Sequence, residues 1–428
     1  MPDSVAHPAD HPLRAALNDE LHARPHLRVE TPSRLTHVAW LADPVEAAAD
    51  LDRLAGLCAR HGTAAPGPED RHGQMPVGDR LLRWERHAEF VTVTVLAPGP
   101  GDGGWSALTP ELEEWTAGIA GGRLAALHLR VEADTEPRHG PESLAALFPG
   151  GQLAGSVVNG GDALAWTDFH VGEDGCSRML VRDVALTPAR TGRLVQRLLE
   201  IETYRMMALL GLPDARALTP ALSEMEARLA AIVERTAAAG STAEEHALLD
   251  RLTLLAAEVE AAAGRTRFRF GATAAYAALV ERRLQELREE RIPGLPRIGV
   301  FLERRFGPAV RTCEAARRRL AELAEGVGRA GAMLRTRVDV QLAEQNAELL
   351  RSMEARARAQ LRIQEAVEGL SVVAITYYLI GLLKVVAEGL PALGLHLDHH
   401  LLAAGAVPLV LGAAWVGLRR LRRALKAD

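Results

Sequence analysis

The sequence predicts an α+β N-terminal domain followed by an all-α helical region, a long stalk helix and two C-terminal transmembrane helices. Three observations predict this order. Short apolar runs with β-branched residues alternate with helix-start signals as far as Leu186. From Pro188 the apolar residues recur with the 3.6-residue period of a helix. Two apolar runs of about eighteen residues follow near the C-terminus, each long enough to cross a ~30 Å hydrocarbon layer.

These changes of pattern predict the domain boundaries. We expect an α+β cytosolic domain over 1–187 and a helical region over 188–331. A stalk helix over 332–369 then leads into a transmembrane hairpin with a basic tail over 370–428.

Composition excludes several classes of protein. With 428 residues and 48% hydrophobic content the chain can bury a core, so it is not a disordered protein. A net charge of -5 gives no general attraction to nucleic acid, and the sequence suggests no basic patch outside the C-terminal tail, so we expect no nucleic-acid partner. The three cysteines are too far apart for a CxxC pair, which favours free thiols in a reducing compartment. The N-terminus lacks the basic start and apolar stretch of a secretory signal, which favours the cytoplasm.

The N-terminal domain opens with a strand over Arg34–Leu41 and a helix. Asp43 at the N-cap, Pro44 at the first helical position and Glu46 two residues later form a capping box, which satisfies the free amides of the first turn. A Gly- and Pro-rich loop is expected from Gly62 to Gly78.

Two alternating runs, Leu81–His87 and Glu89–Pro98, predict a hairpin. Thr109 caps a second helix, and Arg123–Ala133 returns as a strand. The resulting order β, α, β, β, α, β is that of a split βαβ unit. Further strands are predicted over Gln152–Val158, Ala163–Val171 and Ser177–Leu186.

Start and stop signals divide the helical region into hairpinned helices. The first is capped by Thr187 and stops at Gly211. Further starts are predicted at Thr219 with Pro220, at the capping box of Ser241 and Glu244, and at Ala272, the last helix ending near Arg291.

The stalk segment after Gly331 contains no proline, and its only glycine is Gly369. If the helix continues into the terminal apolar stretch, it exceeds fifty residues and needs a partner along its length. Gln345 and Asn346 interrupt the apolar row, which favours packing in an oligomeric stalk over a two-stranded coiled coil. A helix lying along the protein's own bundle is the alternative.

The terminal stretch indicates a membrane hairpin. Leu401–Leu418 carries no charge, and the basic tail after it favours retention in the cytoplasm. The first run, Leu370–Ala387, holds one lysine near its far end, where the side chain can reach the headgroups. We therefore expect an inner-membrane protein with two spans, both termini cytoplasmic and the lipid bilayer as a partner. The alternative is a pair of core helices in a soluble bundle. The predicted anchoring residues are Lys384, Trp415, Arg419, Arg420, Arg422 and Arg423.

Three stretches resemble a bacterial family of membrane-anchored proteins that contain a domain of unknown function. They are HPLRAALNDELHARP (His11–Pro25), TCEAARRRLAEL (Thr312–Leu323) and MLRTRVDVQLAEQNAELLRSMEARARAQLRIQEAVEGLSVVAITYYLIGLLK (Met333–Lys384). The resemblance implies a soluble N-terminal part, a helical middle and a C-terminal membrane anchor. It implies no activity and no ligand.

Motifs of catalysis are missing from the sequence. The phosphate-binding loop, the nucleophile elbow and the HExxH zinc motif do not occur. We therefore expect no enzyme, no catalytic residue and no cofactor. One candidate metal site, at the outer membrane surface, would combine Glu388, His396, Asp398, His399 and His400, although a short solvated turn explains the same residues.

Two functions follow from this layout. The first is a membrane-anchored scaffold or interaction protein, a homo-oligomer whose cytosolic domain meets an unknown protein partner. The second rests on a similarity in architecture to CorA-type divalent-cation channels. In that case Glu388 and Asp398 would lie at the outer mouth and Ser371, Thr376 and Tyr377 would line the conduit. The outer turn lacks the Gly-Met-Asn motif of those channels.

Overall fold

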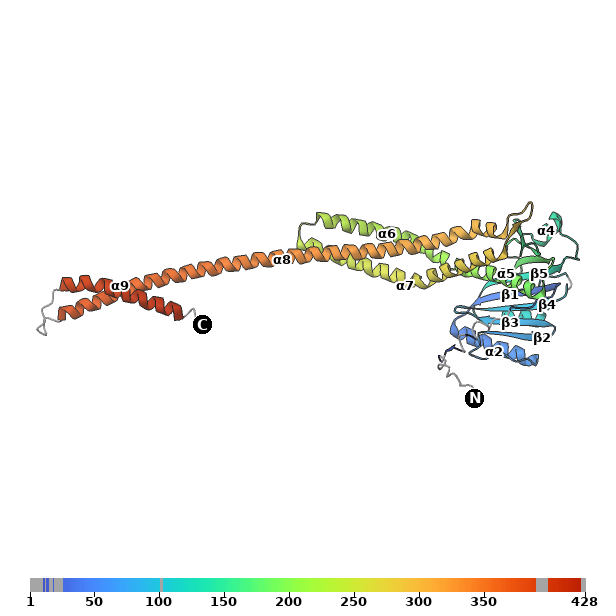
Figure 1. Cartoon of the computed structure of the whole chain (residues 1–428), viewed down its shortest axis with the longest axis horizontal. Coiled ribbons are helices and arrows are strands. Elements are labelled where there is room, and N and C mark those ends of the chain that lie inside the picture. Colours follow the sequence, from blue (N-terminus) through green and yellow to red (C-terminus); the bar gives the residue numbers. More distant parts are fainter. Residues whose placement is uncertain are drawn as a thin grey trace, which may run out of the picture. The chain divides into compact units, whose positions relative to one another are not determined.

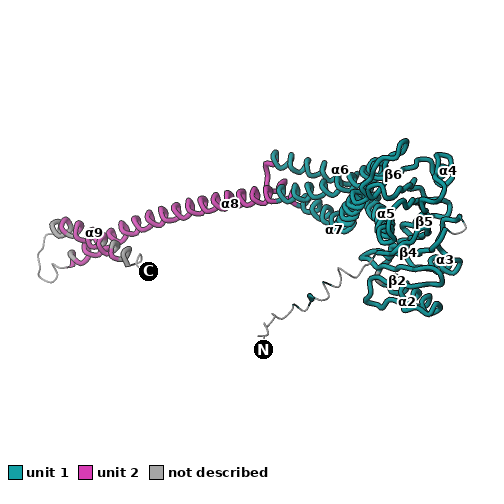
Figure 2. The backbone as a smooth tube through the Cα atoms, turned by 45° about the vertical axis from the view of Figure 1, so that its right-hand side comes forward, with its two compact units in different colours: residues 1–238, 250–331 teal, residues 239–249, 332–428 magenta. Residues whose placement is uncertain are grey.

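The computed structural model describes residues 11, 13, 14, 18, 26–100, 103–389 and 399–424. The chain divides into two compact units, which we treat separately (Figure 2). Unit 1 comprises 1–238 and 250–331, and unit 2 comprises 239–249 and 332–428.

Unit 1 contains a mixed sheet with nine strands in its described part, in the order β2-β3-β4-β1-β5-β8-β7-β6-β9. Neighbouring strands run antiparallel except β5 and β8, which are parallel. The strands are β1 Ser33–Leu41, β2 His72–Val77, β3 Arg80–Arg86, β4 Phe90–Pro98, β5 Gly122–Ala133, β6 Ala154–Val158, β7 Ala163–Thr167, β8 Ser177–Asp183 and β9 Glu290–Arg291.

Helices separate and follow the strands (Figure 1). They are α2 Pro44–Arg60, α3 Pro110–Ala117, α4 Pro141–Leu147, α5 Pro188–Leu209, α6 Gly211–Ala238, α7 Thr242–Leu287, α8 Ile298–Gly389 and α9 His399–Ala424. The predicted order of a sheet region followed by a mostly helical region with a long helix is therefore confirmed.

The split βαβ unit is present, because β3, β4, β1 and β5 lie in that order with each neighbour antiparallel. Both predicted helix caps in it are confirmed. Asp43 accepts hydrogen bonds from the amides of Val45 and Glu46, and Glu46 accepts one from the amide of Asp43 at 2.9 Å. Thr109 caps α3.

The predicted loop from Gly62 to Gly78 is wrong in its last part, which forms β2. The run HGQMPV contains a glycine and a proline, so it lacks the alternation of a strand. Met75 and Val77 are nevertheless buried in the core under α2 and α3. This burial and the backbone pairing with β3 overcome the weak local signal.

The three further strands of the prediction are confirmed as β6, β7 and β8, although β7 and β8 end earlier than expected. Asp183 closes β8, because its carboxylate accepts a hydrogen bond from the amide of Leu186 at 2.8 Å and turns the chain toward α5. The short elements α4 and β9 were not predicted.

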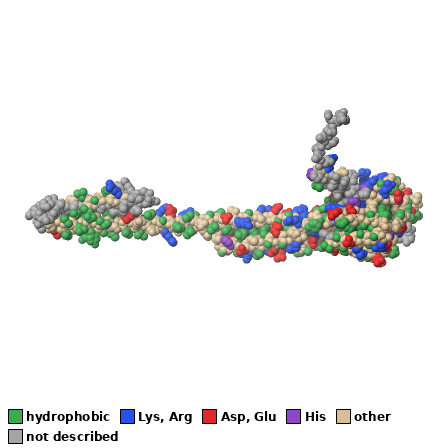
Figure 3. All heavy atoms as spheres, turned by 90° about the horizontal axis from the view of Figure 1, so that it is seen from below, with side chains coloured by type: hydrophobic (Ala, Val, Ile, Leu, Met, Phe, Trp, Pro, Cys, Tyr) green, Lys and Arg blue, Asp and Glu red, His purple; other side chains and the backbone are tan. Residues whose placement is uncertain are grey.

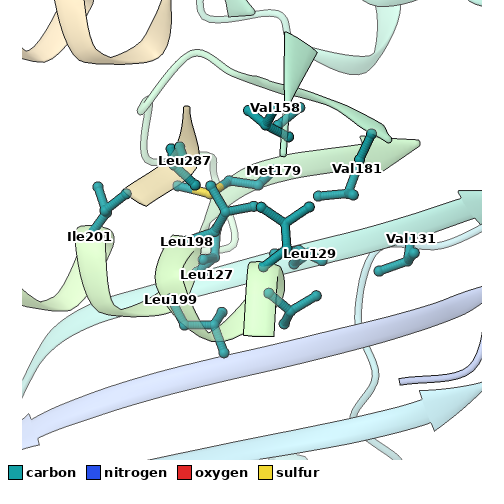
Figure 4. Packing of buried hydrophobic residues seen from close by; sticks show 14 of the residues in the cluster. Leu127, Leu129, Val131, Val158, Met179, Val181, Leu198, Leu199, Ile201 and Leu287 are labelled. Atoms are coloured by element: carbon teal, nitrogen blue, oxygen red, sulfur yellow. The ribbon is translucent and has the colours of Figure 1, made fainter. Parts of the chain in front are cut away.

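One face of the sheet packs against α5. Leu127, Leu129, Met179 and Val181 of the central strands meet Leu198 of α5 in this core (Figure 4). The segment before β1 also crosses α5, where a Cβ on Gly192 would lie 1.6 Å from the carbonyl oxygen of Leu27. Glycine is needed there because backbone and helix approach so closely.

The other face carries two separate cores. α2 and α3 pack over β1, β3 and β4, burying Trp40, Leu54 and Trp84. α4 packs over β7 and β8, where Phe148 contacts Trp166 in a second cluster.

Several predicted helix boundaries are wrong. α6 begins at Gly211 and includes Pro220, and α7 runs through Gly264 instead of starting again at Ala272. Buried residues continue on both sides of each break signal, Leu218 and Leu222 in α6 and Val259 and Phe270 in α7. Tertiary packing therefore offsets one lost hydrogen bond at the proline and the backbone entropy of the glycine.

The long helix α8 begins at Ile298, well before the predicted stalk start after Gly331. Its uninterrupted run into the terminal apolar stretch is confirmed. In unit 2 the start of α7 contacts α8, because Arg337 lies 2.7 Å from the buried carboxylate of Glu245. α9 folds back beside the end of α8 (Figures 1 and 2).

Candidate functional site

A cavity of about 830 Å³ opens on the sheet face that carries α2 and α3. β1, β5 and β8 contribute to its lining, as do α3 and the segment 104–108 before it. The cavity lies where the two cores of this face meet. Cys176 belongs to the core under α2 and α3, Trp105 packs against the core around α4, and both side chains line the cavity.

Basic side chains outnumber acidic ones in this lining. Four arginines, Arg34, Arg80, Arg123 and Arg178, face two acids, Glu113 and Asp174. Arg80 also pairs with the exposed carboxylate of Asp79 at 2.6 Å. The cavity therefore concentrates positive charge in a chain whose net charge is -5.

Strand register brings these residues together. Arg34 of β1 lies opposite Arg130 of β5, and Thr36 lies opposite His128. In the parallel pair His128 lies opposite Arg178 of β8. Because side chains alternate along a strand, all five project from the same face. Two arginines directly opposite each other repel, so the arrangement costs stability.

Trp105 contacts two of these arginines. The Arg130 and Arg178 guanidinium carbons lie 5.4 Å and 5.7 Å from the ring centroid of Trp105. The indole is held in turn by Phe148, whose ring it meets edge-on at 5.8 Å. Cation–π attraction offsets part of the repulsion and fixes both guanidinium groups. We call Arg34, Arg130, Arg178 and Trp105 the arginine cluster.

The remaining contacts of the arginine cluster are polar. Arg34 donates to the carbonyl of Ser106 at 3.0 Å. Arg178 donates to Asp174 at 3.2 Å, while its buried Nε makes no hydrogen bond within the described residues. One donor of Arg178 thus has no partner among the described residues.

His128 lies beside the cluster and is buried. Its Nδ1 is 2.9 Å from the hydroxyl of Thr36, which also accepts a hydrogen bond from the amide of Ala107 at 2.8 Å. Burial lowers the pKa of His128 to about 4, against a smaller opposing effect of Asp174. The imidazole is therefore neutral at pH 7, so its 3.8 Å approach to Asp174 is not an ion pair there.

Cys176 and Asp174 complete the floor. Burial raises the pKa of the Cys176 thiol to about 11, so the thiolate does not form near neutral pH. Burial of Asp174 favours its neutral form, but hydrogen bonds from the Cys176 amide and Arg178 outweigh this and lower its pKa. The site thus holds a protonated thiol, a neutral imidazole and a carboxylate already paired with arginine. This chemistry suits binding of an anion better than nucleophilic catalysis.

Comparison with known proteins gives one match. The family DUF3422, described as "Protein of unknown function (DUF3422)", matches residues 9–425. The chain belongs to the DUF3422 family. No curated protein and no solved structure matches it. The resemblance to a family with a domain of unknown function is therefore confirmed, and the match includes unit 1, α8 and α9.

A second distinctive surface of this DUF3422 chain is the end of α8. Among the described residues, α8 is the helix with a stretch both long and apolar enough to cross a membrane, and 6% of that stretch is buried. The apolar part of α9, Val407–Gly417, is shorter. Figure 3 shows hydrophobic side chains gathered at the left-hand end of the view, where α8 and α9 lie.

The sequence-predicted metal residues are only partly described. Glu388 lies 4.0 Å from Lys384 one turn earlier, and both side chains are exposed. His396 and Asp398 lie outside the described residues, and His399 and His400 begin α9 with side chains that are not described. Within the described part of the chain no group of three or more potential metal ligands is found.

The predicted anchoring residues lie on α8 and α9. Lys384, Trp415 and Arg420 are exposed. Arg419, Arg422 and Arg423 belong to α9, but their side chains lie outside the described residues.

The sequence did not predict the arginine cluster. Its residues come from four segments separated in sequence by up to about 140 residues, so no local run of basic residues reveals them. One signal was available. Arg34 shares a face of its strand with Val38 and Trp40, which are buried and apolar.

Proposed function

We propose that this DUF3422 chain is a membrane-anchored, non-enzymatic interaction protein. Its two spans are 370–387 in α8 and 401–418 in α9, and the sheet unit lies in the cytoplasm. One observation carries the proposal: after Gly369, α8 exposes large apolar side chains around most of its circumference. Leu370, Val373, Tyr377 and Val385 are each more than 60% exposed.

The less exposed residues of this stretch define one narrow face. Val372, Thr376 and Ile380 are spaced four apart, so they lie on one side of the helix. α9 lies beside this part of α8 and shields this face of the helix (Figure 1). The other faces have no cover within the described residues. Removing apolar surface from water gains about 25 cal/mol per Å², so a lipid environment stabilises such a hairpin strongly.

Two hydroxyl groups in this stretch are satisfied within the helix. The hydroxyl of Ser371 donates to the carbonyl of Val367 at 2.9 Å, and that of Thr376 to Val372 at 2.7 Å. Lipid offers no hydrogen bonds, so a spanning helix must satisfy its polar groups internally. The same bonds leave these hydroxyls less available to line an ion conduit.

The basic residues give the orientation. Lys384 stands near the outer end of the first span, where its stem can reach the headgroups. The arginines at the end of α9 favour a cytoplasmic C-terminus, and a two-span hairpin then places the N-terminal unit on the same side. This supports an inner-membrane location with both termini in the cytoplasm.

Self-association is the second part of the proposal. Before the span, α8 exposes apolar side chains among charged ones, including Leu342, Leu349, Met353 and Leu361. Their spacing follows one side of the helix only approximately, which suits packing among several helices. We propose that copies of the chain associate along this stretch, and that the sheet unit meets a cytosolic protein partner.

Three buried titratable groups of unit 1 are poorly suited to acid–base or nucleophilic catalysis. A general base works best with a pKa near the working pH. Burial lowers the pKa of His37 to about 3 and that of His128 to about 4, while Cys176 is raised to about 11.

Membrane fractionation of the full chain tests the anchor. We expect the protein to stay with the membrane after washing at high salt and at pH 11, and to be released by detergent. A chain ending at Glu368 is expected in the aqueous fraction. Full-length protein recovered without detergent as a soluble oligomer would refute the anchor, because other copies would then cover the apolar faces.

A further inference from the structure

We propose that the arginine-lined cavity of unit 1 binds a small anion that carries more than one phosphate or carboxylate group. This assignment goes beyond membrane anchoring and does not depend on it, because every lining residue belongs to unit 1.

Two arginines repel each other at the edge of the cavity, which Arg34 lines and Arg130 adjoins. Arg34 and Arg130 lie opposite each other between β1 and β5, and Arg34 is only 9% exposed. Like charges in register destabilise a sheet, and burial strengthens the effect because water screens them less. Glu132 meets Arg130 only at 4.0 Å. An anion in the cavity would relieve this repulsion, and local conflicts of this kind are typical of binding sites.

Arg123 and Arg178 supply hydrogen-bond donors around the cavity. Arg123, at the start of β5, lines the cavity and makes no hydrogen bond or ion pair within the described residues. Its guanidinium lies against Gly175, where a Cβ would come within 2.2 Å of Nη2. Gly175 has a positive φ of 74°, a backbone conformation that favours glycine. Together with the buried Nε of Arg178, this leaves donors on two sides of the cavity.

The volume of the cavity and the shape of the guanidinium group both suit a small ligand with several anionic groups. A volume of about 830 Å³ lies within the range of about 300–1,000 Å³ typical of small-molecule sites. Arginine presents a planar fork that matches the two oxygens of a carboxylate or phosphate group. Arginines from β1, β5 and β8 can therefore hold separate anionic groups of one ligand.

Calorimetric titration of the full chain in nanodiscs of neutral phosphatidylcholine tests the assignment. The probes are pyrophosphate for phosphate ligands and citrate for carboxylate ligands. We expect at least one probe to bind, and Arg123→Gln to weaken it about tenfold or more, the usual effect of losing a charge-assisted hydrogen bond. Arg267→Gln, which removes an exposed arginine of α7 outside the cavity, is expected to leave binding unchanged.

Each outcome decides the assignment. Tighter pyrophosphate binding assigns phosphate groups, and tighter citrate binding assigns carboxylates. The proposal is overturned if neither probe binds at millimolar concentration, or if Arg123→Gln and Arg267→Gln behave alike. Arg123 is exposed, so its substitution does not disturb the core. As a second readout, the bound probe should raise the thermal midpoint of the unaltered chain but not that of Arg123→Gln.

Discussion

The Nδ1 atom of His128 lies 2.9 Å from the hydroxyl oxygen of Thr36, and both side chains are buried. His37 is held in the same manner on the opposite face of β1. Its two ring nitrogens lie 2.8 Å and 2.9 Å from the hydroxyls of Thr94 and Thr203. Hydroxyl partners hold an imidazole in place without supplying the negative charge that would stabilise its protonated form.

These two histidines predict acid sensitivity of unit 1. The pKa values of His37 and His128 are about 3 and about 4 in the folded chain, below the ordinary 6.5. Between these values and 6.5 the unfolded chain therefore binds more protons than the folded chain. The stabilisation that comes from the neutral imidazoles is therefore fully present above pH 6.5 and decreases as the pH falls toward 4. Each histidine contributes a slope of about 1.4 kcal/mol per pH unit. Urea unfolding followed by tryptophan fluorescence at several pH values measures it.

The matched variants are His128→Gln and His170→Gln. The first removes one buried imidazole and should reduce the slope, whereas His170 is exposed and its loss should leave the slope unaltered. Equal slopes in both variants would contradict the assignment of acid sensitivity to His128.

A lysine in the first span should impair membrane insertion. Ile375 is 51% exposed in the middle of the apolar stretch, and Leu361 is 60% exposed before it. A lysine at the centre of a bilayer costs about 2.5–3.5 kcal/mol. Ile375→Lys is therefore expected to raise the share of alkali-extractable protein, while Leu361→Lys should not. The same extraction of both variants would place Ile375 outside lipid.

Self-association along α8 predicts a disulfide between copies. The native cysteines Cys58, Cys176 and Cys313 are buried, so they give little background. Leu349→Cys should give a covalent dimer on mild oxidation of membranes. Arg351→Cys, about 200° further around the helix, should give much less. Non-reducing electrophoresis compares the two, and equal yields would argue against a defined contact along Leu349.

A buried ion pair gives a prediction about stability. Glu132 of β5 accepts from His139 at 2.8 Å and lies 3.4 Å from Arg182 of β8, and Glu132 and Arg182 are both nearly inaccessible. Arg182→Met should lower the free energy of unfolding by about 3–5 kcal/mol, because it leaves the carboxylate buried with less compensation. Combining it with Glu132→Gln should restore part of the loss. An additive double-variant cycle would show that the pair is not coupled.

The split βαβ unit could be predicted because its signals are local. Asp43 and Thr109 stand at N-cap positions with proline next to each, and the two helices of the unit begin there. Thr187 gives the same signal for α5. The helix boundaries at Pro220 and Ala272 could not be predicted, because burial on both sides of the break signals decides them. Such burial depends on neighbours that the local sequence does not show.

The cavity could not be predicted for a related reason. Arg34 and Arg130 meet only because β1 and β5 pair in one particular register, and Arg178 joins them only because β5 and β8 are parallel. A shift of one residue would turn each of these side chains to the opposite face. The apolar end of α8, in contrast, is evident from composition alone.

The connector 287–296 between α7 and α8 closes one border of the sheet. β6 pairs with β9 through Ser156 and Val157. On either side of this pairing, the amide of Gly155 donates to the carbonyl of Pro296 and the amide of Asn159 donates to the carbonyl of Leu287. At the opposite border β2 contains Pro76, which has no amide hydrogen to offer. Another chain therefore finds little to pair with by strand addition. Copies of the chain at high concentration can then meet without their sheets fusing into aggregates.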